Sequence, residues 1–396
     1  MEKPKVTLAD NIYWVGVIDY NLRDFHGFTT KRGTTYNAFL ICDEKTALID
    51  TVKHTFGEEL LSKVTEIVDP EKIDYIVVNH VEMDHSSSLP MVAKICKNAT
   101  IITSERGKDA IIEHYGPDFK IQTVKTGDTL KLGAHTLSFI DATMLHWPDS
   151  MFTYVVENKI LMPSDAFGQH LATGQRFDDE VDEHIIMEEA KIYYANILML
   201  LGPQITRKIQ EVVQLGIPID TIAPSHGIIW RKNPSKIIQA YSEWAAGTTK
   251  KKATIVFDTM WGSTEKMARS IAEGVISEGV EVKMFKIHSS DNTEAVTEIL
   301  DSKAVIIGSP TINNGMFPTL GAFMTYITGL RPKNKIWSFF GSFGWGSGAV
   351  RNMTEMARKA GFQIREPGLE IKYVPDKDDL QKCYELGKNI AKEVKA

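Results

Sequence analysis

The stretch Ile76-Val77-Val78-Asn79-His80-Val81-Glu82-Met83-Asp84-His85 carries the pattern that decides the fold of the first part of this chain. Its first residues are apolar and β-branched, which predicts a buried strand. Four side chains that can bind a metal then follow within six residues: His80, Glu82, Asp84 and His85. A strand that delivers such a loop can place these groups around two neighbouring cations, so the H-x-E-x-D-H pattern predicts a metal site.

Three more metal-binding side chains occur further along the chain, and each follows an apolar run that predicts a strand. They are His146 in Leu145-His146-Trp147-Pro148, Asp165 in Pro163-Ser164-Asp165-Ala166, and His226 in Ser225-His226-Gly227. Any one of these residues fits an ordinary polar loop, but the set of seven does not. Seven imidazole and carboxylate groups indicate two metal ions.

Composition excludes several other classes of protein. At 396 residues, with 43% hydrophobic and 24% charged residues, the chain is long enough for two globular domains. A net charge of −6 provides no basic surface for phosphates, which argues against nucleic acid as a partner. The N-terminus has no apolar signal core, and no run of eighteen apolar residues occurs, so we expect a cytoplasmic protein without membrane contact.

The cysteines are few and are not spaced for a shared site. Cys42, Cys96 and Cys383 form no C-x-x-C pair, so the chain encodes neither a disulfide framework nor an iron–sulfur or rubredoxin-type centre. Any redox centre held by thiolates has to come from another protein.

Strands and helices alternate unevenly over the first 250 residues, which indicates a sheet-rich α/β layer domain. The predicted strands are 35–39, 46–50, 75–79, 100–103, 136–140, 153–156, 160–162 and 221–223, and the predicted helices are 187–201 and 234–246. Around Gly247-Thr248-Thr249-Lys250-Lys251-Lys252 the chain becomes polar and small. We therefore predict two domains, 1–249 and 250–396.

The second domain has a regular βαβ rhythm from Ala253 onwards. The predicted strands include 254–257, 281–286, 304–308 and 336–340, and the predicted helices include 265–278 and 350–360. Such alternation predicts an open parallel sheet with helices on both faces and with ligands at the carboxyl ends of its strands.

The segment Asp258-Thr259-Met260-Trp261-Gly262-Ser263-Thr264-Glu265 follows the first strand of this domain and opens its first helix. It resembles the phosphate loop of flavodoxins. Hydroxyl groups, backbone amides and the helix N-terminus can hold a phosphate dianion without a lysine or a metal ion, which suits a bound mononucleotide. Ser263 or Thr264 alone would fit an ordinary helix N-cap, so the rest of the domain favours the flavin interpretation.

Two more loops follow strands at the same predicted edge, at 309–315 and 341–348. Their amides, Asn side chains and aromatic rings could line an isoalloxazine ring, although Trp261 and Trp345 also fit ordinary packing. Residues 344–349 match G-x-G-x-x-A, but not after the first strand of the domain, so we interpret them as a flavin loop and not as a dinucleotide site. The predicted FMN contacts are Thr259, Met260, Trp261, Gly262, Ser263, Thr264, Pro310, Thr311, Asn313, Asn314, Ser342, Phe343, Gly344, Trp345 and Gly346.

The first domain resembles the metallo-β-lactamase superfamily, whose first motif usually reads H-x-H-x-D-H. Glu82 stands where its hydrolases usually carry a histidine, and a carboxylate beside imidazoles favours iron over zinc. A centre of this kind followed by a flavodoxin-like domain resembles the flavodiiron proteins over essentially the whole chain, including 32–38, 145–151 and 222–227. The resemblance implies a metallo-β-lactamase-like αββα sandwich followed by a flavodoxin-like doubly wound parallel sheet.

The same resemblance assigns roles to the seven residues. One iron would be held by His80, Glu82 and His146 and the other by Asp84, His85 and His226, with Asp165 as the bridge. It also implies reduction of dioxygen to water or of nitric oxide to nitrous oxide, as protection against oxidative or nitrosative stress. The implied electron donor is rubredoxin or a reduced deazaflavin coenzyme, and the implied assembly is a head-to-tail homodimer, either alone or as a dimer of dimers.

Two alternatives and four side chains remain open at this point. A hydrolase would use the metals to activate water but would leave the flavin domain without a purpose, and a pure electron carrier would not need a complete ligand set. His26 and His170 could surround the metal site, whereas the other histidines, His54, His114, His135, His184 and His288, suit surfaces or loops. Tyr193 and Tyr194 could cap the iron pocket or simply pack their helix.

Overall fold

The computed structural model describes residues 5–365 and 367–396. The chain forms two compact units, of which the first comprises residues up to Tyr193 together with Pro203–Ser242. The second comprises Tyr194–Gly202 and Glu243–Ala396. The division into domains at 249/250 remains our proposal for where one fold ends and the next begins.

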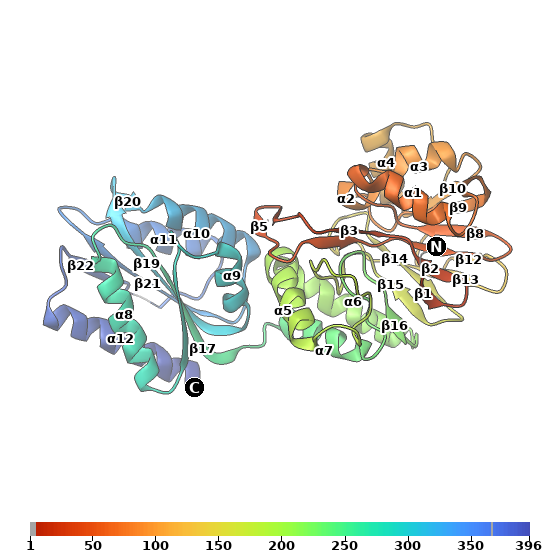
Figure 1. Ribbon diagram of the computed structural model, residues 1–396. Helices are drawn as coiled ribbons and strands as arrows, with labels where there is room; N and C mark the ends of the chain where they lie inside the picture. The colour runs from red at the N-terminus through yellow and green to blue at the C-terminus, as the bar shows by residue number, and fades with distance from the viewer. Residues whose placement is uncertain (1–4, 366) are drawn as a thin grey trace. The chain divides into compact units, whose positions relative to one another are not determined.

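Two large sheets build the first unit (Figure 1). The seven-stranded sheet has the order β1-β2-β7-β8-β9-β10-β11, and the five-stranded sheet has the order β12-β13-β14-β15-β16. Small ladders pair β3 with β6 and β4 with β5. The strands are β1 (Val6–Ala9), β2 (Ile12–Trp14), β3 (Val17–Asp19), β4 (Asp24–Phe25), β5 (Phe28–Thr29), β6 (Thr34–Tyr36), β7 (Phe39–Ile41), β8 (Thr46–Ile49), β9 (Ile73–Val77), β10 (Thr100–Thr103), β11 (Ile121–Thr123), β12 (Thr129–Lys131), β13 (Thr136–Asp141), β14 (Met151–Val155), β15 (Ile160–Met162) and β16 (Thr221–Ile222).

Apolar side chains from both sheets form one buried core between them. It includes Phe39 and Ile49 from the first sheet and Leu137, Phe139 and Val155 from the second. The opposite face of the first sheet has its own core, to which α1, α3 and α4 contribute. Figure 1 shows α5, α6 and α7 on the side of the second sheet, so the predicted αββα sandwich is confirmed.

The helices of this region are short and several are single turns. They are α1 (Gly57–Thr65), α2 (Met83–Ser86), α3 (Leu89–Ile95), α4 (Glu105–Tyr115), α5 (Glu183–Tyr193), α6 (Gly202–Gln214) and α7 (Pro234–Ala246), with the 3-10 turns η1 (His54–Phe56), η2 (Pro70–Lys72) and η4 (Met199–Leu201) and the π-helical turn η3 (Tyr194–Leu198). Helix α7 has the predicted bounds. The predicted continuous helix 187–201 is wrong, because the chain changes from α-helix to a π turn at Tyr194.

One predicted strand also divides in two. The prediction for 35–39 was a single strand, whereas β6 ends at Tyr36 and β7 begins at Phe39. The interruption lies at Asn37, whose backbone amide donates to the carbonyl oxygen of Ser225 and not to a neighbouring strand. The chain therefore leaves one ladder to contact a distant loop before it enters the next.

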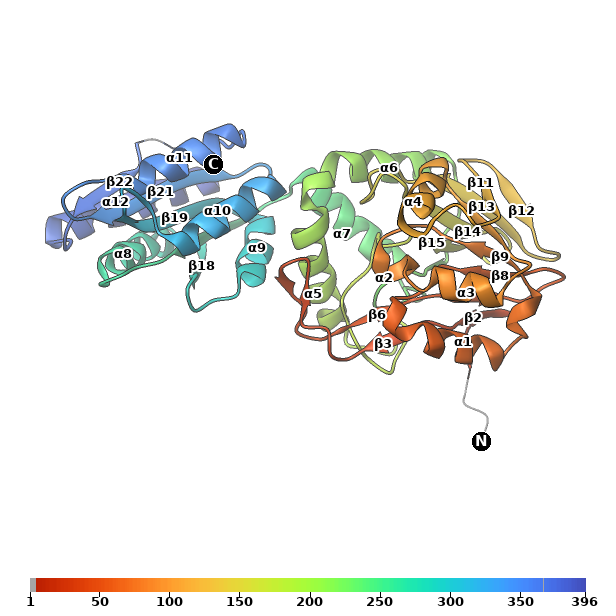
Figure 2. The same cartoon turned by 90° about the horizontal axis from the view of Figure 1, so that it is seen from above.

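The second unit is a parallel sheet with the order β18-β17-β19-β21-β22, to which the short β20 adds an antiparallel pair with β19. Figures 1 and 2 show α8 and α12 together on one face and α9, α10 and α11 on the other, which confirms the predicted doubly wound sheet. The strands are β17 (Lys250–Phe257), β18 (Glu281–Lys286), β19 (Ser302–Ile312), β20 (Gly315–Met316), β21 (Ile336–Phe343) and β22 (Leu369–Lys372), and the helices are α8 (Ser263–Ser277), α9 (Asn292–Asp301), α10 (Pro318–Leu330), α11 (Ala349–Lys359) and α12 (Lys377–Lys395).

Strand β17 begins at Lys250, four residues before the predicted strand 254–257, so the lysine run at 250–252 belongs to the sheet. Lys252 is buried, and its ammonium group pairs with Asp301 and, at 2.7 Å, with Glu298. Paired charges can be buried where isolated ones cannot, so the run enters the sheet. Among the described helices, none combines the length and apolarity that a membrane span requires.

Candidate functional site

The seven predicted metal ligands lie on loops and one short helix at the ends of strands from both sheets of the first unit. His80 and Glu82 follow β9, and Asp84 and His85 lie on α2. His146 follows β13, Asp165 follows β15, and His226 follows β16. Because β13, β15 and β16 run in the same direction, their carboxyl ends meet at one edge and bring residues distant in sequence together.

Four of the seven residues form a first group, with His80, Glu82, His146 and Asp165 offering ligand atoms within 4.8 Å of one another. Glu82 Oε2 lies 3.1 Å from Nε2 of both His80 and His146. Asp165 Oδ2 lies 3.1 Å from His146 Nε2 and 3.6 Å from His80 Nε2. Two imidazoles and two carboxylates thus converge on one buried point.

The remaining three residues form a second group, in which Asp84, His85 and His226 also offer atoms within 4.8 Å of one another. His226 Nε2 lies 3.1 Å from Asp84 Oδ2, and His85 Nε2 lies 3.5 Å from the same oxygen. Asp165 Oδ1 lies 2.9 Å from His85 Nε2 and 3.4 Å from His226 Nε2. The two oxygens of Asp165 therefore face different groups, which is the arrangement of a bridging carboxylate.

The buried carboxylates of this cluster favour positive charge beside them. Burial lowers the pKa of His80, but hydrogen bonds with Asp149 and Glu82 outweigh it and raise the pKa to about 10. Burial likewise lowers the pKa of His146, yet bonds with Asp165 and Glu82 raise it to about 10. Protons on these imidazoles supply positive charge that two metal ions would otherwise supply, and a metal would displace them.

The carboxylates show the same preference. Burial raises the pKa of Asp165, but the charge of His85 and the hydrogen bond with His146 hold it well below its usual range. Both oxygens of Asp84 are buried and accept no hydrogen bond from the residues that the structure describes, although His226 lies close in distance. Buried ionised oxygens without donors are costly unless a cation binds them, so the donor set fits two metal ions.

Other side chains orient the predicted ligands. Asp149 Oδ2 lies 3.2 Å from His80 Nδ1 and also accepts the backbone amide of Val81 at 2.7 Å. His226 Nδ1 donates to the carbonyl oxygen of Thr35 at 2.7 Å, which orients the ring with Nε2 toward the second group. Sequence reasoning assigned no role to Asp149 or Thr35, although Asp149 lies only three residues after His146.

His26 and His170 lie beside the cluster but differ in exposure. His26 Nε2 is 2.6 Å from Glu82 Oε1, while 58% of the His26 side chain is exposed. His170 is buried, its Nδ1 lies 2.8 Å from Thr34 Oγ1, and its ring centroid is 4.9 Å from that of His226. Burial and the nearby His226 hold the pKa of His170 well below its usual range, so it is a neutral neighbour of the second group.

The two tyrosines have different surroundings. The Tyr193 ring lies 5.0 Å from that of His170 and 6.1 Å from that of His226, so Tyr193 faces the site. Tyr194 opens the π turn and lies 5.2 Å from the Trp244 ring. Among the histidines predicted to be peripheral, His54, His114, His184 and His288 are exposed. His135 is instead buried and pairs with Asp43 at 2.7 Å.

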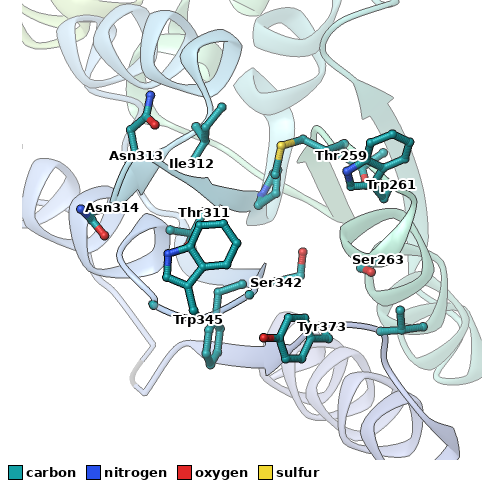
Figure 3. A pocket seen from close by; sticks show the side chains of 16 residues that line it. Thr259, Trp261, Ser263, Thr311, Ile312, Asn313, Asn314, Ser342, Trp345 and Tyr373 are labelled. Atoms are coloured by element: carbon teal, nitrogen blue, oxygen red, sulfur yellow. The ribbon is translucent and has the colours of Figure 1, made fainter.

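A cavity of about 740 Å³ lies at the carboxyl edge of the sheet in the second unit (Figure 3). Its lining comes from the last residues of β19 and β21 and from the loops after β17, β19, β21 and β22, so the predicted loops 309–315 and 341–348 begin while the strands still continue. The predicted flavin residues that line it are Thr259, Met260, Trp261, Ser263, Pro310, Thr311, Asn313, Asn314, Ser342, Phe343, Gly344, Trp345 and Gly346. Its volume lies in the range of ordinary cofactor pockets.

Two predicted residues do not line this cavity, and three unpredicted ones do. Thr264 is fully buried, with its Oγ1 2.9 Å from Ser342 Oγ, and Gly262 caps α8 with φ +87°. These two residues support the phosphate loop without lining the cavity. Ile312, Tyr373 and Val374 line the cavity without having been predicted. The loop after β22 could have been found, since β22 pairs in parallel with β21 and ends at the same edge.

The phosphate loop itself is held by polar contacts. Thr259 Oγ1 accepts the amide of Gly262 at 3.0 Å, and the Thr259 amide donates to Asp258 Oδ1 at 2.8 Å. Asp258 is buried, and its other oxygen accepts the hydroxyl of Thr319 at 2.6 Å. With the N-terminus of α8 directly behind it, the loop fits the phosphate of a mononucleotide.

Comparison with known families agrees with both halves of the chain. A family model described as "ODP family beta lactamase" matches residues 34–227, and a model described as "Flavodoxin" matches residues 255–387. The predicted metallo-β-lactamase-like and flavodoxin-like folds are thereby confirmed.

Full-length relatives are also similar to this chain. A protein of Moorella thermoacetica named nitric oxide reductase is 52% identical and covers 100% of both chains. A coenzyme F420H(2) oxidase of Methanothermobacter marburgensis is 43% identical over 98% of each chain.

Two solved structures match along nearly the whole chain. The rubredoxin oxygen:oxidoreductase of Desulfovibrio gigas superposes with a TM-score of 0.97 at 40% identity, covering 99% of each chain. The flavodiiron protein of Giardia intestinalis superposes with a TM-score of 0.95 at 37% identity, covering 99% of this chain and 98% of that one.

Proposed function

This chain belongs to the flavodiiron protein family, and we propose that it reduces dioxygen to water, nitric oxide to nitrous oxide, or both, at two irons supplied with electrons by FMN. The observation that carries the proposal is the pair of buried ligand groups that share Asp165, in a chain that also contains an FMN-sized cavity. The hydrolase alternative is not favoured, because the full-length relatives carry the names of reductases and oxidases.

We assign His80, Glu82 and His146 to one iron, Asp84, His85 and His226 to the other, and Asp165 to both. When bound, reduced FMN and two ferrous ions supply four electrons, the number that dioxygen needs to become two waters, whereas two nitric oxides need two. The burial of the proposed ligands would keep bulk water away from the irons. All seven predicted ligands are largely buried, and the ring of Phe25 lies 4.8 Å from that of His170 and 6.1 Å from that of His226.

His26 orients Glu82 in this proposal. It holds Glu82 Oε1 at 2.6 Å, while Oε2 lies 3.1 Å from both His80 and His146. Glu82 would therefore bind the first iron through Oε2, while His26 holds Oε1 in a hydrogen bond. His26 lies on the turn between β4 and β5, at φ +52°, followed by Gly27 at φ +84°. A tight turn of this kind fixes the imidazole against the carboxylate.

We also propose a head-to-tail homodimer in which the flavin of one subunit lies beside the irons of the other. Trp261 and Trp345, at the rim of the flavin cavity, are 94% and 93% exposed, and Tyr373 and Val374 beside them are also exposed. Large aromatic rings in an exposed cluster are typical of interaction surfaces. Rubredoxin is the proposed donor, with a reduced deazaflavin coenzyme as the second candidate that the relatives suggest.

In the decisive experiment, the iron- and FMN-loaded protein is reduced under anaerobic conditions by a rubredoxin relay, and separately by a reduced deazaflavin, and its turnover is then measured. Dioxygen and nitric oxide are supplied in separate runs, and peroxide and nitrous oxide are quantified. Dioxygen loss without peroxide supports an oxidase, and nitrous oxide formation supports a nitric oxide reductase. Consumption of neither gas would contradict the proposal.

A mixing experiment tests the dimer. One variant lacks iron ligation (His146→Ala), and the other lacks phosphate binding (Ser263→Glu). In a head-to-tail hybrid, the flavin of the first chain faces the irons of the second, so mixed and re-associated chains should regain turnover that neither homodimer has. Hybrids without turnover would contradict this arrangement, and native mass spectrometry of variants that carry tags of different mass confirms that hybrids form.

A further inference from the structure

Asn37 lies between β6 and β7 and is fully buried. Its backbone amide donates to the carbonyl oxygen of Ser225 at 2.7 Å. Its side-chain Nδ2 donates to the carbonyl oxygens of Pro224 at 2.8 Å and of Gly227 at 3.1 Å. Three bonds from one residue therefore hold the backbone on both sides of His226, which lies 189 positions further along the chain.

The orientation of the Asn37 amide is forced by its partners. Nδ2 faces two carbonyl oxygens, which only accept, and Oδ1 lies 2.9 Å from Trp14 Nε1, which only donates. A flipped amide would oppose acceptor to acceptor and donor to donor. Both side-chain donors and the side-chain oxygen are thus engaged, and no part of the amide is left for another role.

Trp14 is itself held in place by two cations. Lys63 Nζ lies over its ring at 4.6 Å from the centroid, and the Arg176 guanidinium lies over it at 4.7 Å. Arg176 is buried, and its two terminal nitrogens find no hydrogen-bond partner among the described residues, so the cation–π contact with the indole ring favours its position. The indole that supports Asn37 is therefore fixed by charge as well as by packing.

Thr35 completes the support of the loop. Its carbonyl oxygen accepts His226 Nδ1 at 2.7 Å, and its hydroxyl accepts the amide of Gly227 at 2.6 Å. Gly227 has φ +78°, and a Cβ there would lie 2.0 Å from Gln169 Oε1. The loop can therefore occupy this position only as a tight turn, and the segment 35–37 determines where that turn lies.

We propose that Asn37 is a positioning residue for the second iron, acting through the backbone around His226 and supported by Trp14. The inference rests on the proposed function, since it takes His226 as an iron ligand. Its physical basis is that His226 Nε2 has to stay within reach of both Asp84 and Asp165, at 3.1 and 3.4 Å. A turn released from Asn37 would move this nitrogen, while His80, Glu82 and His146 lie on segments that Asn37 does not contact through any of these bonds.

The test compares iron binding in four variants of the full-length protein. Asn37→Leu keeps the number and branching of the side-chain heavy atoms but removes both side-chain donors and the oxygen. His226→Ala and His146→Ala define the signatures of losing the second or the first iron. Tyr154→Phe is the control, because it removes another side-chain bond to a backbone carbonyl, the partly buried one to Pro218 at 2.6 Å, away from the ligands.

Anaerobic ferrous titration against a chelator and Mössbauer spectra are the readouts, with FMN content and circular dichroism as checks of folding. Asn37→Leu should weaken the second iron alone by about 10–100-fold, the usual effect of removing a group that orients a ligand, with the Mössbauer signature of His226→Ala. Tyr154→Phe should retain both irons. If Asn37→Leu does not fold, Trp14→Phe, which removes only the indole N–H, should show the same selective loss, closer to 10-fold.

Wild-type affinity for both irons in a folded Asn37→Leu or Trp14→Phe variant would overturn the inference, as would equal weakening of both irons. A His226→Ala variant that keeps two irons would instead overturn the ligand assignment in the proposed function. The two failures are therefore distinguishable in one set of titrations.

Discussion

Replacing Asp165 with Asn tests the central feature of the metal site. The side chain is 2% exposed, and its Oδ1 faces His85 and His226 while Oδ2 faces His146 and His80. Asparagine keeps the shape but removes the negative charge and turns one of the two ligand atoms into a donor. One of the two groups then loses its shared oxygen, and both lose an anion.

The expected loss of affinity follows from charge and from ligand number. At a separation of 4 Å and an effective dielectric constant near 20, each unit of metal charge loses about 4 kcal/mol of attraction. Removal of a group that only orients a ligand already weakens binding by about 10–100-fold, so loss of the ligand itself should exceed about 100-fold for at least one iron. The other ligands cannot move to replace the lost oxygen, because they lie at the ends of strands in the two sheets.

The assay measures iron per chain after anaerobic exposure to a chelator, together with FMN content and gas consumption. Asp165→Asn should retain FMN, lose at least one iron and consume neither dioxygen nor nitric oxide. Asp220→Asn is the matched control, because that carboxylate is 64% exposed and pairs with Lys159 at 3.1 Å on the surface. An Asp165→Asn protein with two tightly held irons and normal turnover would refute the bridging assignment.

Three further predictions concern stability and flavin binding. Burial raises the pKa of Asp43, but hydrogen bonds from His135 and neighbouring amides outweigh it and hold that pKa well below its usual value. Asp43→Asn should therefore lower the free energy of unfolding by about 1–3 kcal/mol above pH ~4. Because wild type loses the same stabilisation as Asp43 becomes protonated, the difference in melting temperature between the two proteins should shrink as pH falls below that value. Lys252→Met leaves the buried carboxylate of Asp301 with only its other partners, and should destabilise the second unit by about 3 kcal/mol, seen as FMN release at lower temperature, whereas an unchanged release temperature would contradict the pairing argument. In Gly262→Ala the new Cβ meets no described atom within 4 Å, but φ +87° is strained for an L residue by about 1–2 kcal/mol. This strain should weaken FMN binding roughly 10-fold in a fluorescence titration. Unchanged affinity would show that the loop adapts.

The sequence predicts the second unit better than the first for a physical reason. In a doubly wound sheet the central strands are buried apolar runs that alternate with helices, so the predicted strands 304–308 and 336–340 fall within β19 and β21. The first unit has strands of two to six residues with irregular connections, and periodicity over so few residues carries little information. The N-terminal strands, β11 and β12 were not predicted for this reason.

Errors arise where a tertiary contact outweighs local pattern. A lysine run usually indicates a solvated segment, but Asp301 on α9 neutralises Lys252 and allows β17 to begin at Lys250. The residues 35–39 look like one strand, but Asn37 bonds to the His226 loop instead of extending a ladder. Neither partner lies near in sequence, so no window of residues contains the information that decides the local structure.

The candidate metal ligands could be recognised because they are chemically rare and occur in a spaced set, whereas the residues that orient them are common types. Asp149, Thr35 and Asn37 resemble any polar residue at a strand end, and only their contacts reveal what they hold. Predicting such a role from sequence would require knowing the strand order of both sheets first. Sequence patterns therefore identify the groups expected to contact a metal, but not the groups that position them.

Formation of the metal site and closure of the sandwich are physically coupled. The first group combines residues that follow β9 of one sheet with residues that follow β13 and β15 of the other. Without cations, closing the sheets buries Glu82, Asp84 and Asp165 together, and Glu82 and Asp165 raise the pKa values of His80 and His146 in the direction that favours imidazolium. Because metal binding would replace those protons and link both sheets at once, we expect the proposed irons to stabilise the fold of the first unit as well as to form its reactive centre.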